Sequence, residues 1–371
     1  MHLPPFQNLY FSMQLTAQNI IRYLADEQWV TDESALNGEL CWYPLRSRNQ
    51  VFIVEYRLGK GLFLKQAVES PERIKKEVAV QHILHHFSDF DEIRIHLPDF
   101  YGFDEYRRVL VFEHLAQART ILETTELRKQ QSQYLAEKMA HVLAGYHIDL
   151  TRERDTDPTL LVFDRALPWI LKLPNTQDYA REVVLEQIKQ DDFLLQHLDA
   201  AARQWSCSSL IHGDINLKNF MLQTTEQGDC VKLVDWEMAN LGDPLWDLAG
   251  LMQAYVAAGL RYSRPDAKHY ELTESKQFWS KDAIRTMWSR IWATYASKMS
   301  WDEVTRQTAL GKLIGFMAAR LLQSAAELNR ISPEFLAPGA WAMIAEARSY
   351  FKHPGTLINI FNTSAGISYE A

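Results

Sequence analysis

The spacing of apolar residues changes once along the chain, near residue 115. Before that point, short runs rich in β-branched and aromatic residues predict two pairs of strands, at residues 51–58 with 61–68 and 99–103 with 108–112. Gly59-Lys60-Gly61 separates the first pair and is typical of a hairpin turn. Pro71 predicts the first turn of a helix over residues 72–87, because proline there loses no hydrogen bond. A further amphipathic helix is predicted over residues 14–24.

Beyond residue 115 helical spacing dominates, over residues 126–146, 177–204 and much of 243–350, interrupted only by short strands at 220–223 and 230–234. The sequence therefore predicts an α+β fold with two lobes. A small antiparallel-sheet lobe is expected over residues 13–115 and a mainly helical lobe over 116–371. Residues 1–12 are expected to be a disordered tail, because residues 8–13 resemble the scar of an engineered protease site.

Composition excludes several classes of protein. The formal net charge of -8 argues against a nucleic-acid partner, since binding to phosphate backbones needs a basic surface. The three cysteines fit neither a disulfide framework nor a zinc site and predict a reducing, cytoplasmic environment. The apolar stretch Leu313 to Leu322 is shorter than a membrane span and contains Arg320, so no transmembrane helix is expected.

The segment from Ile211 to Glu237 carries the chemistry. Asp214 lies in a predicted loop, Asn219 follows five residues later, and Asp235 comes directly after the next predicted strand. Phosphoryl transfer needs such a set: one carboxylate orients the acceptor hydroxyl and can take its proton, while an amide and a second carboxylate hold the metal that neutralises nucleotide phosphates.

Three motifs in this order are similar to those of the aminoglycoside phosphotransferase and choline kinase superfamily. They are His212-Gly213-Asp214 with Asn219, then Asp235-Trp236-Glu237, then the run from Gly242 to Ala249. The resemblance implies a protein-kinase-like fold with Asp214 as the catalytic base and Asn219 and Asp235 as magnesium ligands. It also implies that Asp247 braces the catalytic loop. His212, directly before the Gly-Asp pair, is expected to hold loop backbone in place.

The same resemblance predicts a lysine on a strand of the small lobe that pairs with a glutamate on the following helix and binds the α- and β-phosphates. Lys65 and Glu77 occupy those places. The turn that covers the phosphates is expected at residues 46–50, which contain no glycine, so Ser47, Asn49 and backbone amides are the expected contacts. Backbone groups of two residues at the lobe junction are expected to bind adenine, Glu113 and Leu115.

The predicted function is magnesium-dependent transfer of the γ-phosphate of ATP to a hydroxyl group of a small molecule. A kinase acting on Ser or Thr of a peptide or natural-product precursor is an open alternative, because the same apparatus serves both. A catalytically silent nucleotide-binding module is the second alternative. The joint presence of Lys65, Asp214, Asn219 and Asp235 speaks against it. The aromatic residues of the C-terminal third form no motif that names the acceptor, and the oligomeric state stays open.

Overall fold

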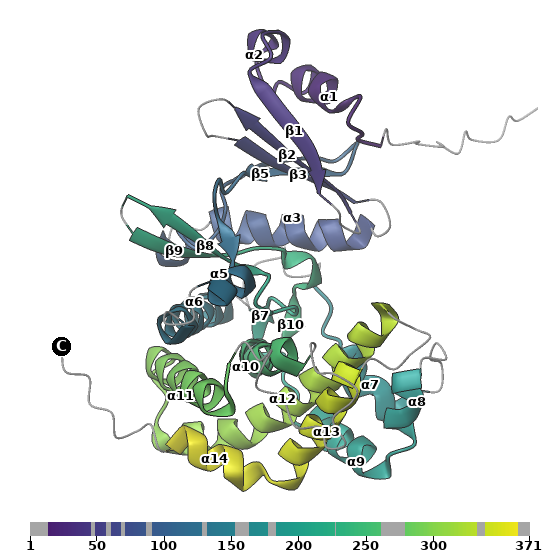
Figure 1. Ribbon diagram of the computed structural model, residues 1–371, viewed down its shortest axis with the longest axis vertical. Helices are drawn as coiled ribbons and strands as arrows, with labels where there is room; N and C mark the ends of the chain where they lie inside the picture. Colours follow the sequence, from purple (N-terminus) through teal and green to yellow (C-terminus); the bar gives the residue numbers. More distant parts are fainter. Residues whose placement is uncertain are drawn as a thin grey trace, which may run out of the picture.

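The protein folds into two lobes (Figure 1), a small N-terminal lobe built on one sheet and a larger, mostly helical C-terminal lobe. The computed structural model describes residues 14–45, 49–56, 61–67, 71–86, 91–127, 132–152, 163–176, 183–226, 228–260, 279–331 and 338–362. The predicted tail at residues 1–12 and the predicted turn at Gly59-Lys60 lie outside these ranges. The predicted α+β, kinase-like fold is confirmed, whereas the boundary between the lobes at residue 115 stays a prediction.

The N-terminal lobe contains a five-stranded antiparallel sheet with the strand order β1-β2-β3-β5-β4. Its strands are β1 (Leu40–Leu45), β2 (Gln50–Tyr56), β3 (Gly61–Gln66), β4 (Phe100–Asp104) and β5 (Val109–Glu113). One face packs against α1 (Ile20–Asp26), and the other lies on α3 (Pro71–His86). Side chains alternate between the faces of a strand. Because Leu64 of β3 packs with α1, the next residue, Lys65, lies on the α3 face.

The N-terminal lobe differs from the prediction at its start. The first helix begins at Ile20 rather than residue 14, because the preceding backbone makes a hydrogen bond outside a helix: Leu15 N donates to the Gln66 side chain. Helix α2 (Asp32–Leu36) and strand β1 were not predicted. Strand β1 is an edge strand that is exposed from residue 41 onward and contains Pro44, so its sequence lacks the apolar alternation that marks a half-buried strand.

The C-terminal lobe surrounds one continuous apolar core. Helix α6 packs on α11, α10 packs on α12, and α12 packs on α13. None of the described helices is both long and apolar enough to span a bilayer. The helices after β5 are α5 (Ile121–Leu127), α6 (Ser132–Arg152), α7 (Trp169–Lys172), α8 (Val183–Lys189), α9 (Asp192–Arg203), α10 (Pro244–Leu260), α11 (Lys281–Lys298), α12 (Glu303–Ile331), α13 (Pro338–Lys352) and α14 (Pro354–Asn362); the short α4 (Asp91–Arg94) precedes β4.

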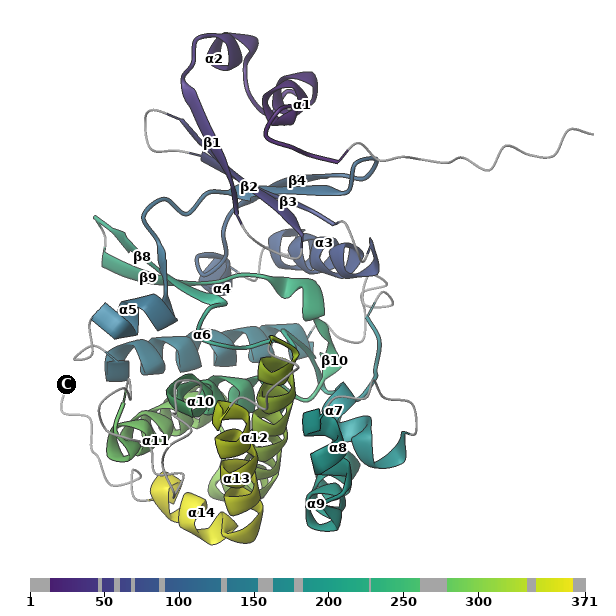
Figure 2. The same cartoon turned by 45° about the vertical axis from the view of Figure 1, so that its right-hand side comes forward.

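Two small sheets lie between the large sheet and the helices (Figure 2). Strand β7 (Ser209–Ile211) pairs with β10 (Asn240–Gly242), and β6 (Arg119–Thr120), β8 (Phe220–Thr225) and β9 (Gly228–Leu233) form the other. The sequence predicted only β8 and β9 of these, because strands of two or three residues are too short to show a period. The loop of residues 212–219 is held at both ends, by β7 before it and β8 after it.

Candidate active site

The first turn of the loop 212–219 is fixed by a buried carboxylate on α10. Asp247 accepts hydrogen bonds from His212 N at 2.6 Å and Gly213 N at 2.9 Å. Burial disfavours its charged form, but the hydrogen bond from His147 and the nearby histidines outweigh that cost, and the pKa of Asp247 lies below its ordinary value. Gly213 has φ +80°, and a Cβ there would collide with the Met238 carbonyl. Asp247 therefore lies where the resemblance predicts a brace.

His212 holds the loop against the chain that follows β9. Its Nε2 lies 3.0 Å from the Val234 carbonyl oxygen, and its Nδ1 lies 3.3 Å from the Asp214 amide nitrogen. These partners require a proton on Nε2, which donates, and a lone pair on Nδ1, which accepts. The ring also packs on Trp236, with centroids 4.8 Å apart. Both ring nitrogens are thus engaged with backbone groups.

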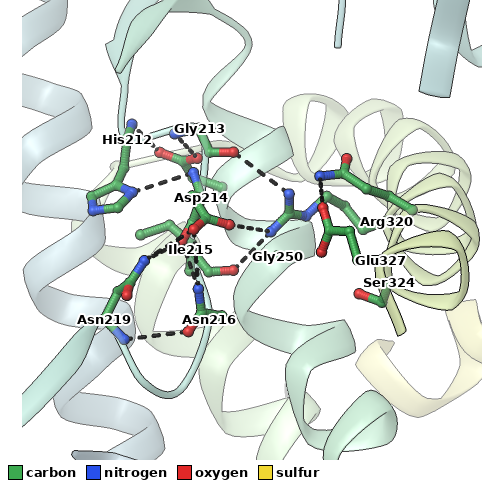
Figure 3. Close-up of polar contacts among 12 residues, drawn as sticks. His212, Gly213, Asp214, Ile215, Asn216, Asn219, Gly250, Arg320, Ser324 and Glu327 are labelled. Carbon is green, nitrogen blue, oxygen red and sulfur yellow. Dashed lines mark hydrogen bonds and ion pairs between the residues drawn. The ribbon is translucent and has the colours of Figure 1, made fainter. Parts of the chain in front are cut away.

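Asp214 lies at the centre of the loop (Figure 3), with its side chain 40% exposed. The side-chain Nδ2 atoms of Asn216 and Asn219 donate to the backbone oxygen of Asp214 at 3.0 and 2.8 Å. The same two atoms lie 3.4 and 3.3 Å from the Asp214 carboxylate. Burial raises the pKa of Asp214; Arg320 opposes that shift and the Glu327 carboxylate adds to it. The carboxylate of Asp214 is therefore partly exposed, while the backbone that carries it is fixed by hydrogen bonds.

Lys65 lies at the other side of the site, where it meets three carboxylates. Its Nζ is 2.8 Å from Glu77 Oε2, 2.5 Å from Asp235 Oδ1 and 3.0 Å from Glu237 Oε2. The structure thus brings together the strand lysine and the helix glutamate that the sequence paired. Burial lowers the pKa of Lys65, but the carboxylates outweigh burial and hold the pKa above its ordinary value. The ammonium is therefore charged at neutral pH.

Glu237 is the residue of this cluster to which the sequence assigned no role. Asp235 and Glu237 both contact Lys65, so their side chains lie on the same side of the chain, while Trp236 between them is buried. The i, i+2 spacing of two acids around a tryptophan is the signal that could have found it. Asp235 itself has φ +68°, an uncommon backbone conformation for an aspartate that aims its carboxylate at Lys65.

The carboxylates of Glu77, Asp235 and Glu237 form a group whose ligand atoms all lie within 4.8 Å of one another. Oxygen donors of this kind fit a magnesium ion. Three carboxylates with one ammonium leave excess negative charge, and burial together with the neighbouring acids raises the pKa of Glu77 to about 7 despite Lys65. The side-chain nitrogen of Asn219 donates a hydrogen bond to the Asp214 carbonyl oxygen, so the side-chain oxygen of Asn219 is the atom that could bind a cation.

Glu237 also contacts the N-terminal lobe at two further places. Asn49 Nδ2 donates to Glu237 Oε2 at 3.0 Å, and Arg73 Nη1 of α3 lies 3.4 Å from Oε1. The predicted phosphate contact of Asn49 stays a prediction, and Ser47 lies outside the described residues. This one carboxylate thus joins the turn before β2, helix α3 and Lys65 to the segment that follows β9.

The segment that joins the lobes is bonded to the sheet. Glu113 N donates to the Asp99 carbonyl at 2.8 Å, and His114 N donates to the Gly61 carbonyl at 2.9 Å. The Leu115 carbonyl accepts from Ala118 N at 3.1 Å. These bonds fix the backbone at the edge of the site, and the role of Glu113 and Leu115 in binding adenine stays a prediction.

The sequence model of the phosphotransferase enzyme family matches residues 44–278, more than half of the chain and the whole of the site just described. The chain belongs to this family. The matched range contains Lys65, Asp214, Asn219 and Asp235. No curated protein is matched by this chain.

Solved structures of kinases share the fold. A choline kinase from Cryptosporidium parvum Iowa II aligns with a TM-score of 0.54 at 13% identity over 95% of this chain and 99% of that one. A choline/ethanolamine kinase family protein from Mesorhizobium loti gives 0.52 at 15% identity, over 92% and 100%. The GDP complex of aminoglycoside 2'-phosphotransferase-IIIa gives 0.50 at 14%, over 83% and 92%. Identities this low establish the fold and not the substrate.

Proposed function

We propose that this phosphotransferase moves the γ-phosphate of ATP to a hydroxyl group of a small molecule and requires magnesium. The observation that carries the proposal is the pairing of two sites: a buried lysine among three carboxylates, and a partly exposed aspartate on a braced loop. The two lie close enough for the Asp235 charge to raise the pKa of Asp214. Membership of the family and the GDP-bound structural neighbour support a nucleotide as the donor.

Each residue then has a distinct task. Lys65 binds the α- and β-phosphates through its buried ammonium, and Glu77 holds that ammonium in place. Asp235 holds the magnesium ion, with oxygens of Asn219 and Glu237 as further ligands. The ion supplies positive charge that neutralises the phosphates. Asp214 orients the acceptor hydroxyl and takes its proton as the bond to phosphorus forms, which leaves ADP as the second product.

A small-molecule acceptor is favoured because kinases of choline and of aminoglycosides share the fold over nearly their full length. The phosphate-binding residues Ser47 and Asn49 and the adenine-binding backbone of Glu113 and Leu115 belong to the same proposal. None of the three cysteines forms a disulfide bond, which supports action in the cytoplasm.

The test is a turnover screen. The protein is incubated with ATP, magnesium and pooled alcohols, amino alcohols, sugars and Ser- or Thr-containing peptides, and ADP release is followed in parallel with reactions that contain EDTA or GTP. Acceptor-dependent ADP release that needs the divalent ion is the expected result. If only a peptide pool is phosphorylated, the proposed acceptor class is wrong. If the protein binds ATP but releases no ADP with any of the pools, the proposed enzymatic function is wrong.

A further inference from the structure

An arginine from a distant helix enters the catalytic loop. Arg320 lies in the middle of α12, inside an apolar stretch, and only 4% of it is exposed. Its Nη2 donates to the Ile215 carbonyl at 2.9 Å, across 105 positions of sequence, and its Nη1 lies 3.5 Å from the Gly213 carbonyl. A buried guanidinium is costly unless its protons are bonded. The carbonyls on both sides of Asp214 accept from the two terminal nitrogens (Figure 3), whereas Nε has no hydrogen-bond partner among the described residues.

The neighbouring helix α10 is shaped to admit this arginine. A Cβ on Gly250 would come within 2.8 Å of the Ile215 oxygen and 3.2 Å of Arg320 Nη2, so a side chain there would push the two apart. One turn earlier on the same face, the ring of Trp246 lies against the guanidinium, 5.4 Å from the centroid. Glycine at one position and an aromatic face at the other together form a slot for a planar cation.

The contact with the catalytic carboxylate is close but is not a hydrogen bond. Arg320 Nη2 lies 3.9 Å from Asp214 Oδ1, beyond hydrogen-bond distance. At this separation the guanidinium attracts the carboxylate without occupying its lone pairs, which stay available for an acceptor hydroxyl. The hydrogen bonds of the guanidinium go instead to the backbone of the residues that flank Asp214.

We propose that Arg320 is a positioning residue for phosphoryl transfer: it holds the backbone on both sides of Asp214 and aims the carboxylate at the acceptor. This proposal rests on the proposed function of Asp214. It differs from a purely structural role, in which a buried arginine only stabilises the packing of α10 and α12. A positioning role acts on the acceptor side, so it changes turnover and leaves the binding of nucleotide at Lys65 intact.

The experiment compares Arg320→Met, Arg320→Lys and Gly250→Ala with wild type, and uses Arg306→Met, at the exposed start of the same helix, as the matched control. kcat and the KM for magnesium-bound ATP are measured with the acceptor found in the screen. Losing hydrogen bonds to a charged group predicts a kcat about 10- to 100-fold lower for Arg320→Met, with the KM for ATP within about twofold. Arg320→Lys keeps the charge but lacks the two terminal nitrogens that bond Gly213 and Ile215, so only part of the lost kcat is recovered.

In Gly250→Ala the new Cβ presses on the Ile215 carbonyl at 2.8 Å and on Arg320 Nη2 at 3.2 Å, so it disturbs the hydrogen bond between them while the charge stays; a lowered kcat with unchanged KM is expected. Arg320→Lys keeps the proposal testable if Arg320→Met does not fold. Unchanged kcat in the Arg320 and Gly250 variants overturns the proposal, as does an equal rise in the KM for ATP. If wild type binds ATP but phosphorylates no acceptor, the proposed function has failed. Amide hydrogen exchange of residues 212–219 then tests separately whether Arg320 holds the loop. Unchanged protection in Arg320→Met overturns the positioning role, and faster exchange supports it.

Discussion

The two sides of the site are held by different kinds of contact. On the C-terminal side, the loop around Asp214 is fixed by hydrogen bonds between its backbone and the side chains of Asp247, Asn216, Asn219 and Arg320. On the N-terminal side, the contacts described for the Lys65 ammonium all go to carboxylate side chains, as charged hydrogen bonds and ion pairs. Bonds to backbone groups fix the course of the loop, whereas bonds between side chains fix only those side chains.

This difference matches the two tasks proposed for the site. The acceptor side must present a carboxylate in a fixed orientation, and preorganised groups lower the barrier most. The nucleotide side must admit phosphates and a cation, which changes the charge around Lys65. An excess of carboxylates over ammonium groups keeps that side ready to accept positive charge. The variants below separate the two sides, in order of decreasing expected effect.

Asp214→Asn tests the acceptor side. Positioned general-base assistance contributes about 10² to 10⁴ in rate, so kcat falls by that range, while the Kd for magnesium-bound ATP changes little because the carboxylate faces the acceptor. Turnover assays and calorimetry measure the two quantities, with Asp229→Asn at the start of β9 as a control. Near-normal turnover would contradict the assignment, and lost nucleotide binding would show that the two sides are not separable.

Lys65→Ala tests the nucleotide side. Removing hydrogen bonds made by a charged group costs about 1.5 to 3 kcal/mol, which predicts a Kd for magnesium-bound ATP about 10- to 100-fold higher. Calorimetry measures the change, with Lys352→Ala on α13, beside Phe193, as the distant control. An unchanged Kd and unchanged turnover would show that this lysine does not bind the nucleotide.

Asp235→Asn and Glu237→Gln separate metal binding from base catalysis. Both variants weaken a carboxylate site for a cation, so their activity falls and is partly restored by excess magnesium or manganese. Asp214→Asn gives no such recovery, because its defect lies on the acceptor side. Activity titrated against metal concentration makes the comparison. If all three variants respond alike, the proposed division of roles between the carboxylates is wrong.

Glu77→Gln tests the excess charge around Lys65 through the pH dependence of stability. The pKa of Glu77 in the folded protein, about 7, lies above its ordinary value of 4.5, so the folded state retains a proton that the unfolded chain releases. Its contribution to stability is therefore full below pH 4.5 and is lost as pH rises toward 7, by up to about 1.4 kcal/mol per pH unit. Urea unfolding at several pH values should show this slope in wild type and a smaller one in the variant.

Local sequence predicted the groups whose positions follow from strand alternation or from a short motif. Lys65 and Glu77 were paired through the family resemblance, and strand alternation places Lys65 on the face of the sheet toward the helix that carries Glu77. The loop from Asp214 to Asn219 was found because its residues are close in sequence. Glu237 was missed although it lies two residues after Asp235, since only the fold shows that both acids contact Lys65.

Taken alone, the sequence determined the family and the two-lobed α+β fold and predicted the residues of the candidate site, because those depend on local periodicity and ordered motifs. Only the tertiary structure revealed what holds them. In the sequence, Arg320 is a charge that interrupts an apolar helix; in the fold, α10 and α12 carry it to the Ile215 carbonyl 105 positions away. Contacts at that separation depend on how helices pack, and packing is a property of the whole core, which no local pattern records.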